Sequence, residues 1–129
     1  MTSFSQFLAQ ASENEIVATA PCRADLAGGT IDIWPLYLFH PGAVSVNLAL
    51  EILTACRITP RAGRDIVLRS HDTGREDSFA SLEDLLTAKS YAHPLAAHLI
   101  RFFKPEGGFT LETHSESPAG AGISGSSAL

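Results

Sequence analysis

Residues 118–129 read PAGAGISGSSAL, and this stretch is the most informative part of the chain about its fold. Glycines at positions 120, 122 and 125 carry no side chain, so backbone N–H groups can close around an anion there. Ser126 and Ser127 follow at what we expect to be the start of a helix, where the helix dipole adds partial positive charge. The stretch therefore predicts a phosphate-binding loop that leads into a helix.

This loop matches two known glycine patterns only in part. Gly120 and Gly125 have the spacing of a Walker A loop, but Ser126 stands where that loop has lysine, which excludes this class. Gly120, Gly122 and Gly125 satisfy the Gly-x-Gly-x-x-Gly pattern of dinucleotide-binding proteins. A flexible glycine-serine linker is a further alternative, although a linker needs neither Pro118 nor the serine pair.

A second motif occupies residues 20–32, which read APCRADLAGGTID. An arginine precedes a glycine break and an aspartate follows it, so Arg23 and Asp32 can converge on one pocket. Arginine offers fixed donors to a phosphate or carboxylate, and aspartate accepts hydrogen bonds from substrate hydroxyls. Taken alone, this segment fits a surface arginine and a turn-stabilising aspartate better than a binding site.

The composition is that of one globular domain. The 129 residues are 45% hydrophobic and 18% charged, enough to bury a core. A net charge of −5 argues against a nucleic-acid-binding face. No apolar run approaches the roughly 18 residues of a membrane span and no signal peptide is visible, so we expect a cytoplasmic protein. Cys22 and Cys56 are expected to be buried free thiols.

The hydrophobic pattern predicts mainly strands in the first half and helices in the second. We expect a helix over 3–12, a strand over 16–20 halted by Pro21, an extended segment over 22–27 and a loop with a short helical turn over 31–40. One long bent strand or two strands over 43–59 and a strand over 65–70 follow. Helices are then expected over 81–88 and 91–104, and a strand over 109–114. This order predicts an α+β domain with helices on one face of a mixed sheet.

The second of these helices carries a stripe of large apolar residues. Leu95, Leu99 and Phe102 share one helical face. We expect this stripe to lie in the core.

Together the two motifs resemble those of the GHMP kinases, which include galactokinase, homoserine kinase, mevalonate kinase and phosphomevalonate kinase. Residues 118–128 are similar to the Pro-x-Gly-x-Gly-Leu-Gly-x-Ser-Ser ATP loop of that family. Residues 21–32 are similar to the Pro-x-Arg-x-x-x-Ala-Gly-Gly-Gly-Thr-Asp motif of its heptose-phosphate kinase and fucokinase branch, and residues 42–44 fit the segment that follows there. Ile123 and Ser124 depart from the family's Leu and Gly, and Thr30 is displaced by one position.

The resemblance implies a ribosomal-protein-S5-domain-2-like α+β fold and an ATP-dependent kinase that phosphorylates a hydroxyl of a sugar or sugar phosphate. It implies ATP and Mg²⁺ as cofactors, with Ser127 as the metal-binding residue and Arg23 as the catalytic residue. Asp32, Gly29 and Thr30 would bind the substrate. The residues that bind the nucleotide would be Pro118, Gly120, Ala121, Gly122, Ile123, Ser124, Gly125, Ser126 and Ser127.

In that family the catalytic acid and the third, glycine-rich motif come later in the chain. Residues 1–129 are therefore expected to form an N-terminal GHMP kinase domain that is incomplete at its C-terminal end and inactive alone. The expected partner is a small-molecule substrate, without nucleic acid or membrane, and homodimer formation stays open. A dinucleotide-binding oxidoreductase fragment and a non-catalytic ligand-binding domain are the alternative functions.

Overall fold

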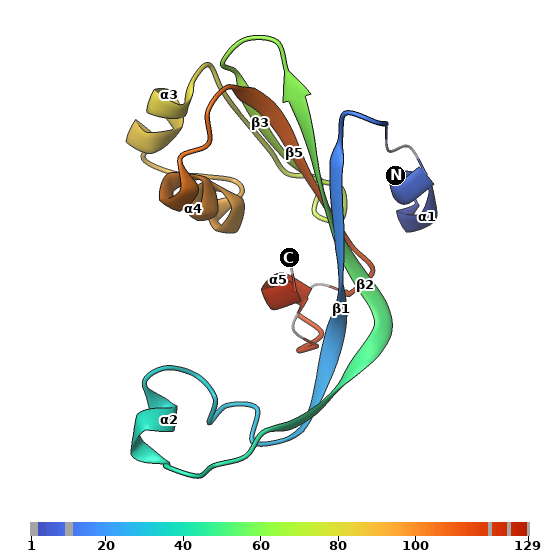
Figure 1. Ribbon diagram of the computed structural model, residues 1–129, viewed down its shortest axis with the longest axis vertical. Coiled ribbons are helices and arrows are strands. Elements are labelled where there is room, and N and C mark those ends of the chain that lie inside the picture. Colours follow the sequence, from blue (N-terminus) through green and yellow to red (C-terminus); the bar gives the residue numbers. More distant parts are fainter. Residues whose placement is uncertain (1–2, 10–11, 119, 124, 129) are drawn as a thin grey trace. The chain divides into compact units, whose positions relative to one another are not determined.

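The computed structural model describes residues 3–9, 12–118, 120–123 and 125–128. The chain divides into two compact units: unit 1 comprises Met1–Thr19 and Ala55–Ser115, and unit 2 comprises Ala20–Thr54 and Glu116–Leu129. The strands are β1 (Ile16–Ala27), β2 (Val46–Arg61), β3 (Ile66–Ser70), β4 (Glu76–Phe79) and β5 (Gly108–Ser115). The helices are α1 (Phe4–Ala9), α2 (Leu36–Phe39), α3 (Leu82–Thr87), α4 (Pro94–Phe103) and α5 (Gly125–Ala128) (Figure 1).

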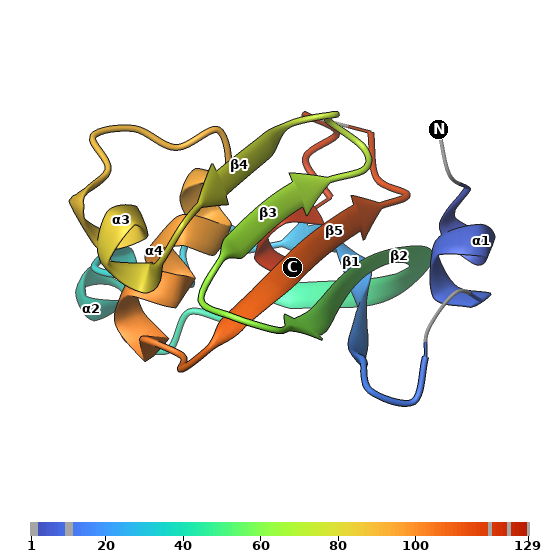
Figure 2. The same ribbon diagram turned by 90° about the horizontal axis from the view of Figure 1, so that it is seen from above.

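Unit 1 is built on a mixed β-sheet with the strand order β1-β2-β5-β3-β4 (Figure 2). Strands β3 and β5 are parallel, with Ile66 opposite Phe109, whereas β3 and β4 are antiparallel, with Ile66 opposite Phe79. Parallel neighbours need a long crossover connection, and β4, α3 and α4 supply it between β3 and β5. The predicted α+β class with a mixed sheet is confirmed.

The core of unit 1 lies between one face of this sheet and the helices α3 and α4. Side chains alternate between the two faces of a strand, and Ile66 and Leu68 of β3 lie on the helix side with Phe109 of β5. They pack against Leu85 of α3 and Ile100 of α4, and all five are at least nine-tenths buried. The predicted layer of helices on one face is therefore present.

Two helix boundaries show how polar side chains set the ends of helices. Ser81 caps α3 as predicted, because its Oγ accepts a hydrogen bond from the backbone N–H of Asp84 at 3.2 Å. The helix expected over 91–104 begins only at Pro94, because the Asp77 carboxylate accepts the preceding backbone N–H groups of residues 92 and 93 at 3.0 and 2.8 Å. Among the described residues, no helix is long and apolar enough to cross a membrane.

The large apolar stripe of α4 was expected in the core, and this prediction is wrong. Leu95, Leu99 and Phe102 are exposed, whereas Ala96, Ala97 and Ile100 are buried against the sheet. Small alanine side chains let the helix backbone approach the strands closely, and the bulky residues are left on the outer side.

Two strands also differ from the prediction. β1 does not stop at Pro21 but runs through it to Ala27. A proline removes one ladder donor and is tolerated in an edge strand, and β1 is one of the two edge strands of the sheet. β4 was not predicted, because its four residues, EDSF, form a short polar edge strand without hydrophobic alternation.

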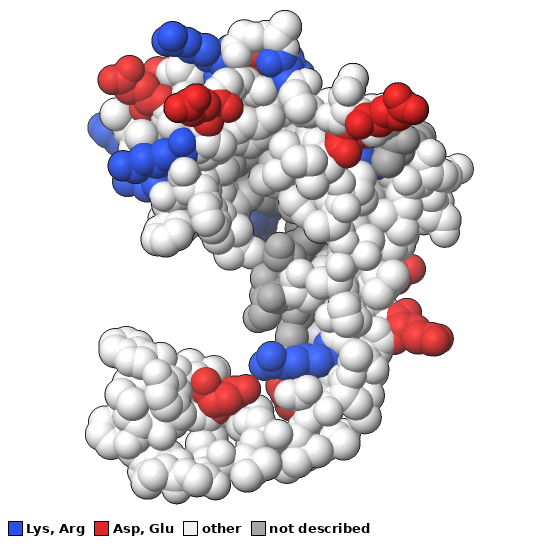
Figure 3. All heavy atoms as spheres, viewed as in Figure 1, with Lys and Arg blue, Asp and Glu red and all other residues white. Residues whose placement is uncertain are grey.

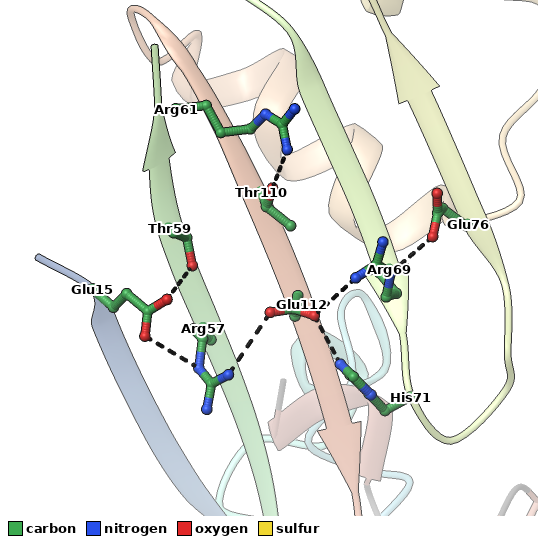
Figure 4. Close-up of polar contacts among 9 residues, drawn as sticks. All are labelled: Glu15, Arg57, Thr59, Arg61, Arg69, His71, Glu76, Thr110 and Glu112. Atoms are coloured by element: carbon green, nitrogen blue, oxygen red, sulfur yellow. Dashed lines mark hydrogen bonds and ion pairs between the residues drawn. The ribbon is translucent and has the colours of Figure 1, made fainter. Parts of the chain in front are cut away.

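The face of the sheet opposite α3 and α4 carries a row of charged side chains in unit 1 (Figure 4). Arg57 of β2 lies between Glu15 and Glu112, at 3.8 Å from a carboxylate oxygen of each. Glu112 of β5 also pairs with Nε2 of His71 at 2.9 Å. Phe7 of α1 covers the row, with its ring centroid 4.2 Å from the Arg57 guanidinium carbon and 5.1 Å from the His71 ring. These contacts hold α1 on this face.

Unit 2 contains the remaining parts of β1 and β2, the connection between them and the glycine loop. The connection includes the single turn α2, as predicted for residues 31–40. The glycine loop leads into α5, so the helix start predicted after it is confirmed. Cys22 of this unit is a fully buried free thiol; Cys56 of unit 1 is free and half-buried, and burial raises the pKa of its thiol.

Candidate functional site

Arg23 is the centre of the first motif in unit 2. It lies on β1, and its guanidinium pairs with two carboxylates: Nε is 3.2 Å from Oδ1 of Asp25, and Nη2 is 3.8 Å from Oδ2 of Asp32. The Arg23 side chain is 41% exposed, so it remains accessible to a ligand. Its Nε is buried and has no aligned hydrogen-bond acceptor among the described residues. The predicted convergence of Arg23 and Asp32 is therefore present in the structure.

The glycine break between Arg23 and Asp32 is a tight turn that only glycine fits. Gly28 has φ +74°, and a Cβ there would lie 2.4 Å from the carbonyl oxygen of Val44. The Gly28 carbonyl accepts hydrogen bonds from the Ile31 N–H at 3.0 Å and from the Ser45 hydroxyl at 2.8 Å. The turn thus brings the chain back so that Asp32 reaches Arg23.

Gly29 has a different reason to lack a side chain. A Cβ at this position would come within 2.7 Å of the Asp25 carboxylate. Asp25 therefore lies directly against the backbone of the glycine break while its other oxygen pairs with Arg23. Thr30 is exposed, and it was predicted to bind the substrate together with Gly29 and Asp32. Its carbonyl accepts a hydrogen bond from the Ile33 N–H at 3.4 Å.

The glycine loop is anchored where it enters unit 2. The backbone N–H of Glu116 donates to the Leu53 carbonyl at 2.9 Å, and the Glu116 carboxylate accepts the Leu53 N–H at 2.8 Å. Pro118 then begins a turn, because its carbonyl accepts the Ala121 N–H at 3.1 Å. Both ends of the predicted loop are thus fixed by local structure, with α5 at the far end.

Within the loop, the glycines supply conformations that other residues rarely adopt. Gly120 and Gly122 have φ +78° and +70°, in the left-handed region. A Cβ on either would meet nothing within 4 Å, so the space beside these two residues is open. Ser124 lies outside the described residues, as do the side chains of Ser126 and Ser127, although the backbone of these two serines belongs to α5.

One hydrogen bond joins the two motifs. The backbone N–H of Arg23 donates to the carbonyl oxygen of Ile123 at 3.1 Å. Residues about a hundred positions apart in the sequence therefore meet within unit 2. The glycine loop lies beside the strand that carries the exposed guanidinium of Arg23.

Asp25 is a residue that the sequence interpretation missed. We predicted Asp32 as the acidic member of the site, yet Asp25 makes the shorter contact with Arg23. A strand places residues i and i+2 on the same face, so the spacing of Arg23 and Asp25 carried this signal. Recognising residues 22–27 as part of one strand would have shown it.

The described residues of the loop and Arg23 suit an anionic ligand. Two loop glycines border open space, and one half-exposed guanidinium has a buried Nε without an aligned acceptor. In the described part of the chain, no group of three or more His, Cys, Asp or Glu side chains could hold a metal ion.

The fold is shared with a number of solved structures, among them three kinases. A D-glycero-D-manno-heptose 1-phosphate kinase from Bacteroides thetaiotaomicron is 24% identical with a TM-score of 0.62, and the match covers 86% of this chain and 37% of that one. The mevalonate kinase of Methanococcus jannaschii is 13% identical with a TM-score of 0.68, covering 92% and 38%. Lactococcus lactis galactokinase complexed with galactose is 19% identical with a TM-score of 0.66, covering 91% and 30%.

These neighbours are kinases of the family that the two motifs resemble, and they show that the chain has the fold of this group. The chain spans only 37%, 38% and 30% of the lengths of these three proteins, in the order given. No protein-family model matches the chain, and no curated protein matches it.

Proposed function

We propose that this chain is the ATP-binding part of a small-molecule kinase of the GHMP family, which transfers the γ-phosphoryl group of ATP to an alcohol group. The observation that carries the proposal is the hydrogen bond from the Arg23 N–H to the Ile123 carbonyl. It brings the Arg-and-Asp motif and the glycine loop into one place, and each motif alone would be ambiguous. The fold shared with three solved kinases supports the same assignment.

The backbone amides of the loop are the proposed phosphate ligands. Gly120 and Gly122 adopt positive φ beside open space, so a phosphate can approach the main chain without meeting a side chain. Pro118, Ala121 and Ile123 belong to this binding loop through their backbone groups, and residues 124–127 complete it. Glycine is required here for conformation and access.

Arg23 is the proposed catalytic residue. Phosphoryl transfer depends mainly on positioning and on stabilising the charge of the transferring group. A guanidinium on a strand beside the loop offers fixed donors to that charge. Its pairing with Asp25 and Asp32 orients it before a ligand arrives.

Asp32 is the proposed ligand of the substrate hydroxyls, and the neighbouring Gly29 and Thr30 would line the same region. When bound, Mg²⁺ would neutralise phosphate charge, and the hydroxyl of Ser127 would hold it. The residue that accepts the substrate proton is not assigned to this chain, because the family's catalytic acid belongs to a later segment. We propose that residues 1–129 form the N-terminal domain of the kinase, incomplete at its C-terminal end and inactive alone.

A sugar or sugar phosphate is the proposed substrate. The residues 21–32 resemble most the motif of the heptose-phosphate kinase and fucokinase branch. Two of the solved neighbours, the heptose 1-phosphate kinase and the galactokinase, are sugar kinases by name. Such a kinase would act in the cytoplasm, where ATP and phosphorylated sugars occur.

Isothermal titration of the 129-residue chain with ATP in the presence of Mg²⁺ tests the nucleotide assignment, with NAD as the comparison ligand. We expect a one-to-one complex with ATP that NAD does not displace. Binding of NAD without binding of ATP would favour an oxidoreductase fragment and would contradict the proposal. The same titration in Arg23→Met checks that the complex forms at this site.

A further inference from the structure

Glu116 is a carboxylate to which the proposed kinase activity assigns no role. By sequence, unit 2 has only five charged residues, namely Arg23, Asp25, Asp32, Glu51 and Glu116. Figure 3 illustrates this scarcity, because the surface over α2 is white and therefore uncharged. Arg23 and the two aspartates form the candidate site, whereas Glu116 follows directly after β5 and precedes the glycine loop.

The Glu116 side chain acts as a hydrogen-bond acceptor in place of the backbone where β5 ends. Neighbouring strands exchange backbone N–H and C=O groups, and almost every such group needs a partner. The Glu116 N–H donates to the carbonyl of Leu53 on β2 at 2.9 Å, as in a strand. The Leu53 N–H, however, donates to Oε2 of the Glu116 carboxylate at 2.8 Å. Because the carboxylate satisfies this N–H, the main chain after Glu116 can leave the sheet.

The chain between Glu116 and the loop glycines is stiff. Ser117 precedes a proline, which restricts its backbone to extended conformations, and the ring of Pro118 fixes its own φ. The Pro118 carbonyl then accepts the Ala121 N–H at 3.1 Å, which closes a turn that contains Gly120. The position of Glu116 therefore determines where this turn lies.

The glycine loop has a second anchor at its other end. The Ile123 carbonyl accepts the Arg23 N–H at 3.1 Å. Gly120 and Gly122, which have positive φ, lie between the two anchors. A glycine-rich segment that is held at one end only samples many conformations. Both anchors are therefore needed to keep the loop amides in one arrangement before a ligand binds.

We propose that Glu116 is a positioning residue of the phosphate site. Its carboxylate, hydrogen-bonded to the Leu53 N–H, holds the glycine loop in the conformation that binds the polyphosphate. It acts through the loop and not by contact with the phosphates. This inference rests on the proposed nucleotide site and adds to it a residue outside the loop and outside the Arg23 cluster.

The charge and the position of Glu116 lead to opposite expectations. A negative charge near an anion site weakens anion binding, so removing the charge alone should tighten the ATP complex. Removing the anchor should weaken the complex, because only molecules with the loop in place can bind. Glu116→Gln removes the charge but keeps an acceptor oxygen for the Leu53 N–H, whereas Glu116→Ala removes both. The two variants therefore separate the two effects.

Isothermal titration with ATP and Mg²⁺ compares both variants with wild type. We expect Glu116→Ala to bind ATP at least about tenfold more weakly, which corresponds to one lost hydrogen bond to a charged group. Glu116→Gln should bind ATP as tightly as wild type or more tightly. In hydrogen exchange of the ligand-free proteins, the Ala121 amide should lose protection in Glu116→Ala and keep it in Glu116→Gln. Circular dichroism verifies that both variants fold.

Asp77→Ala in unit 1 is the matched control. Asp77 is also a carboxylate that accepts backbone N–H groups, those of Ala92 and His93 at 3.0 and 2.8 Å, just before α4. This variant should lower the stability measured by urea denaturation and leave the affinity for ATP unchanged. A loss of ATP affinity as large as that of Glu116→Ala would overturn the proposal, because the effect would then not be specific to the loop.

The wild-type titration tests the proposed nucleotide site by itself, and a wild-type chain that binds no ATP overturns both proposals. Where wild type binds ATP, two further results overturn the positioning role alone. One is an unchanged or tighter ATP complex in Glu116→Ala. The other is an equal loss of affinity in Glu116→Ala and Glu116→Gln, which would assign the effect to the charge of the carboxylate.

Discussion

Two arginines, one in each unit, both pair with carboxylates but differ in how far they are exposed to solvent. Arg57 of unit 1 pairs with Glu15 and Glu112, and its side chain is 6% exposed beneath the ring of Phe7. Arg23 of unit 2 also pairs with two carboxylates, but its side chain is 41% exposed and lies on the strand that contacts the glycine loop. An enclosed guanidinium can only stabilise the fold, whereas an open one can still receive a ligand.

The exposure of the arginine therefore distinguishes an ion pair that only stabilises the fold from one that can also take part in ligand binding. Removing one partner of an enclosed ion pair leaves the other buried and uncompensated, so the loss of stability is large. Removing one partner of an exposed pair costs little, because water replaces it. Replacing the arginine by methionine should therefore have different effects in the two units. In unit 1 it should lower the stability of the fold, and in unit 2 it should weaken ligand binding with little change in stability.

Arg57→Met should have the largest effect on stability. It leaves the Glu15 and Glu112 carboxylates without their shared cation and removes the partner of the Phe7 ring, so we expect a loss of about 3 kcal/mol in the free energy of unfolding. Urea denaturation at pH 7 measures it. Arg61→Met is the matched control: its 2.6 Å pair with Asp65 is exposed, so the loss should stay below about 1 kcal/mol. Equal losses in the two variants would contradict the comparison.

Gly28→Ala should be the next most costly change, and it tests the turn that brings Asp32 to Arg23. The substitution forces a residue with a side chain into φ +74° and places its Cβ 2.4 Å from the Val44 carbonyl oxygen. We expect a loss of about 2–4 kcal/mol from strain and the shift of this backbone.

Gly74→Ala in unit 1 is the matched control for this turn. Gly74 has φ +66°, but a Cβ there meets nothing within 4 Å, so about 1 kcal/mol is expected. Thermal unfolding of both variants gives the difference. If Gly28→Ala costs no more than Gly74→Ala, the contact with Val44 does not constrain the turn.

Arg23→Met should hardly change stability and should strongly reduce nucleotide binding. The pairs with Asp25 and Asp32 are exposed, so a loss below about 1 kcal/mol is expected in urea denaturation. Hydrogen bonds to a charged group contribute about 1.5–3 kcal/mol, which corresponds to roughly a 10- to 150-fold weaker complex with ATP. A variant that loses stability like Arg57→Met but binds ATP normally would assign Arg23 a structural role.

The smallest expected effect is a change in the acid stability of unit 1. The backbone N–H of Ser12 at 2.9 Å, the Thr59 hydroxyl at 2.7 Å and the Arg57 charge lower the pKa of Glu15 below its ordinary value of 4.5, against the opposing effect of burial. A carboxyl whose folded pKa is lowered stabilises the fold fully above its unfolded pKa, and this contribution is lost as pH falls through the lowered value. The stability advantage of wild type over Glu15→Gln should therefore be constant near neutral pH and shrink below about pH 4.5.

Urea denaturation of the two proteins between pH 7 and pH 3 checks this dependence. An advantage that grows as the pH falls would show that Glu15 is not stabilised in its charged form.

The sequence predicted the parts of the fold that depend on local rules. The strands at 65–70 and 109–114 have clear apolar patterns, and Ser81 is a standard helix cap. The continuation of β1 through Pro21 could not be predicted locally, because proline is tolerated there only through the edge position of the strand. The buried face of α4 was predicted wrongly for a similar reason. Ala96 and Ala97 are buried because the helix lies close to the sheet, and the spacing of the large residues does not indicate this.

The candidate site shows the same limit. The convergence of Arg23 and Asp32 was predicted from one short motif, residues 20–32, and the structure brings these side chains to 3.8 Å. The role of Asp25 depended on recognising residues 22–27 as part of one strand, and the row of charges around Arg57 depends on sheet order. Contacts between strands that are distant in the sequence cannot be predicted from local sequence patterns.

The most direct test of the account is a nuclear magnetic resonance titration of the ¹⁵N-labelled chain with ATP and Mg²⁺. We predict that the backbone amide shifts concentrate in unit 2, at residues 23–32 and 116–128, and that the amides around Arg57 and Glu112 in unit 1 stay where they are. Shifts that centre on the charged row of unit 1, or no shifts at saturating ATP, would contradict the claim that the Arg23 region and the glycine loop form one nucleotide site.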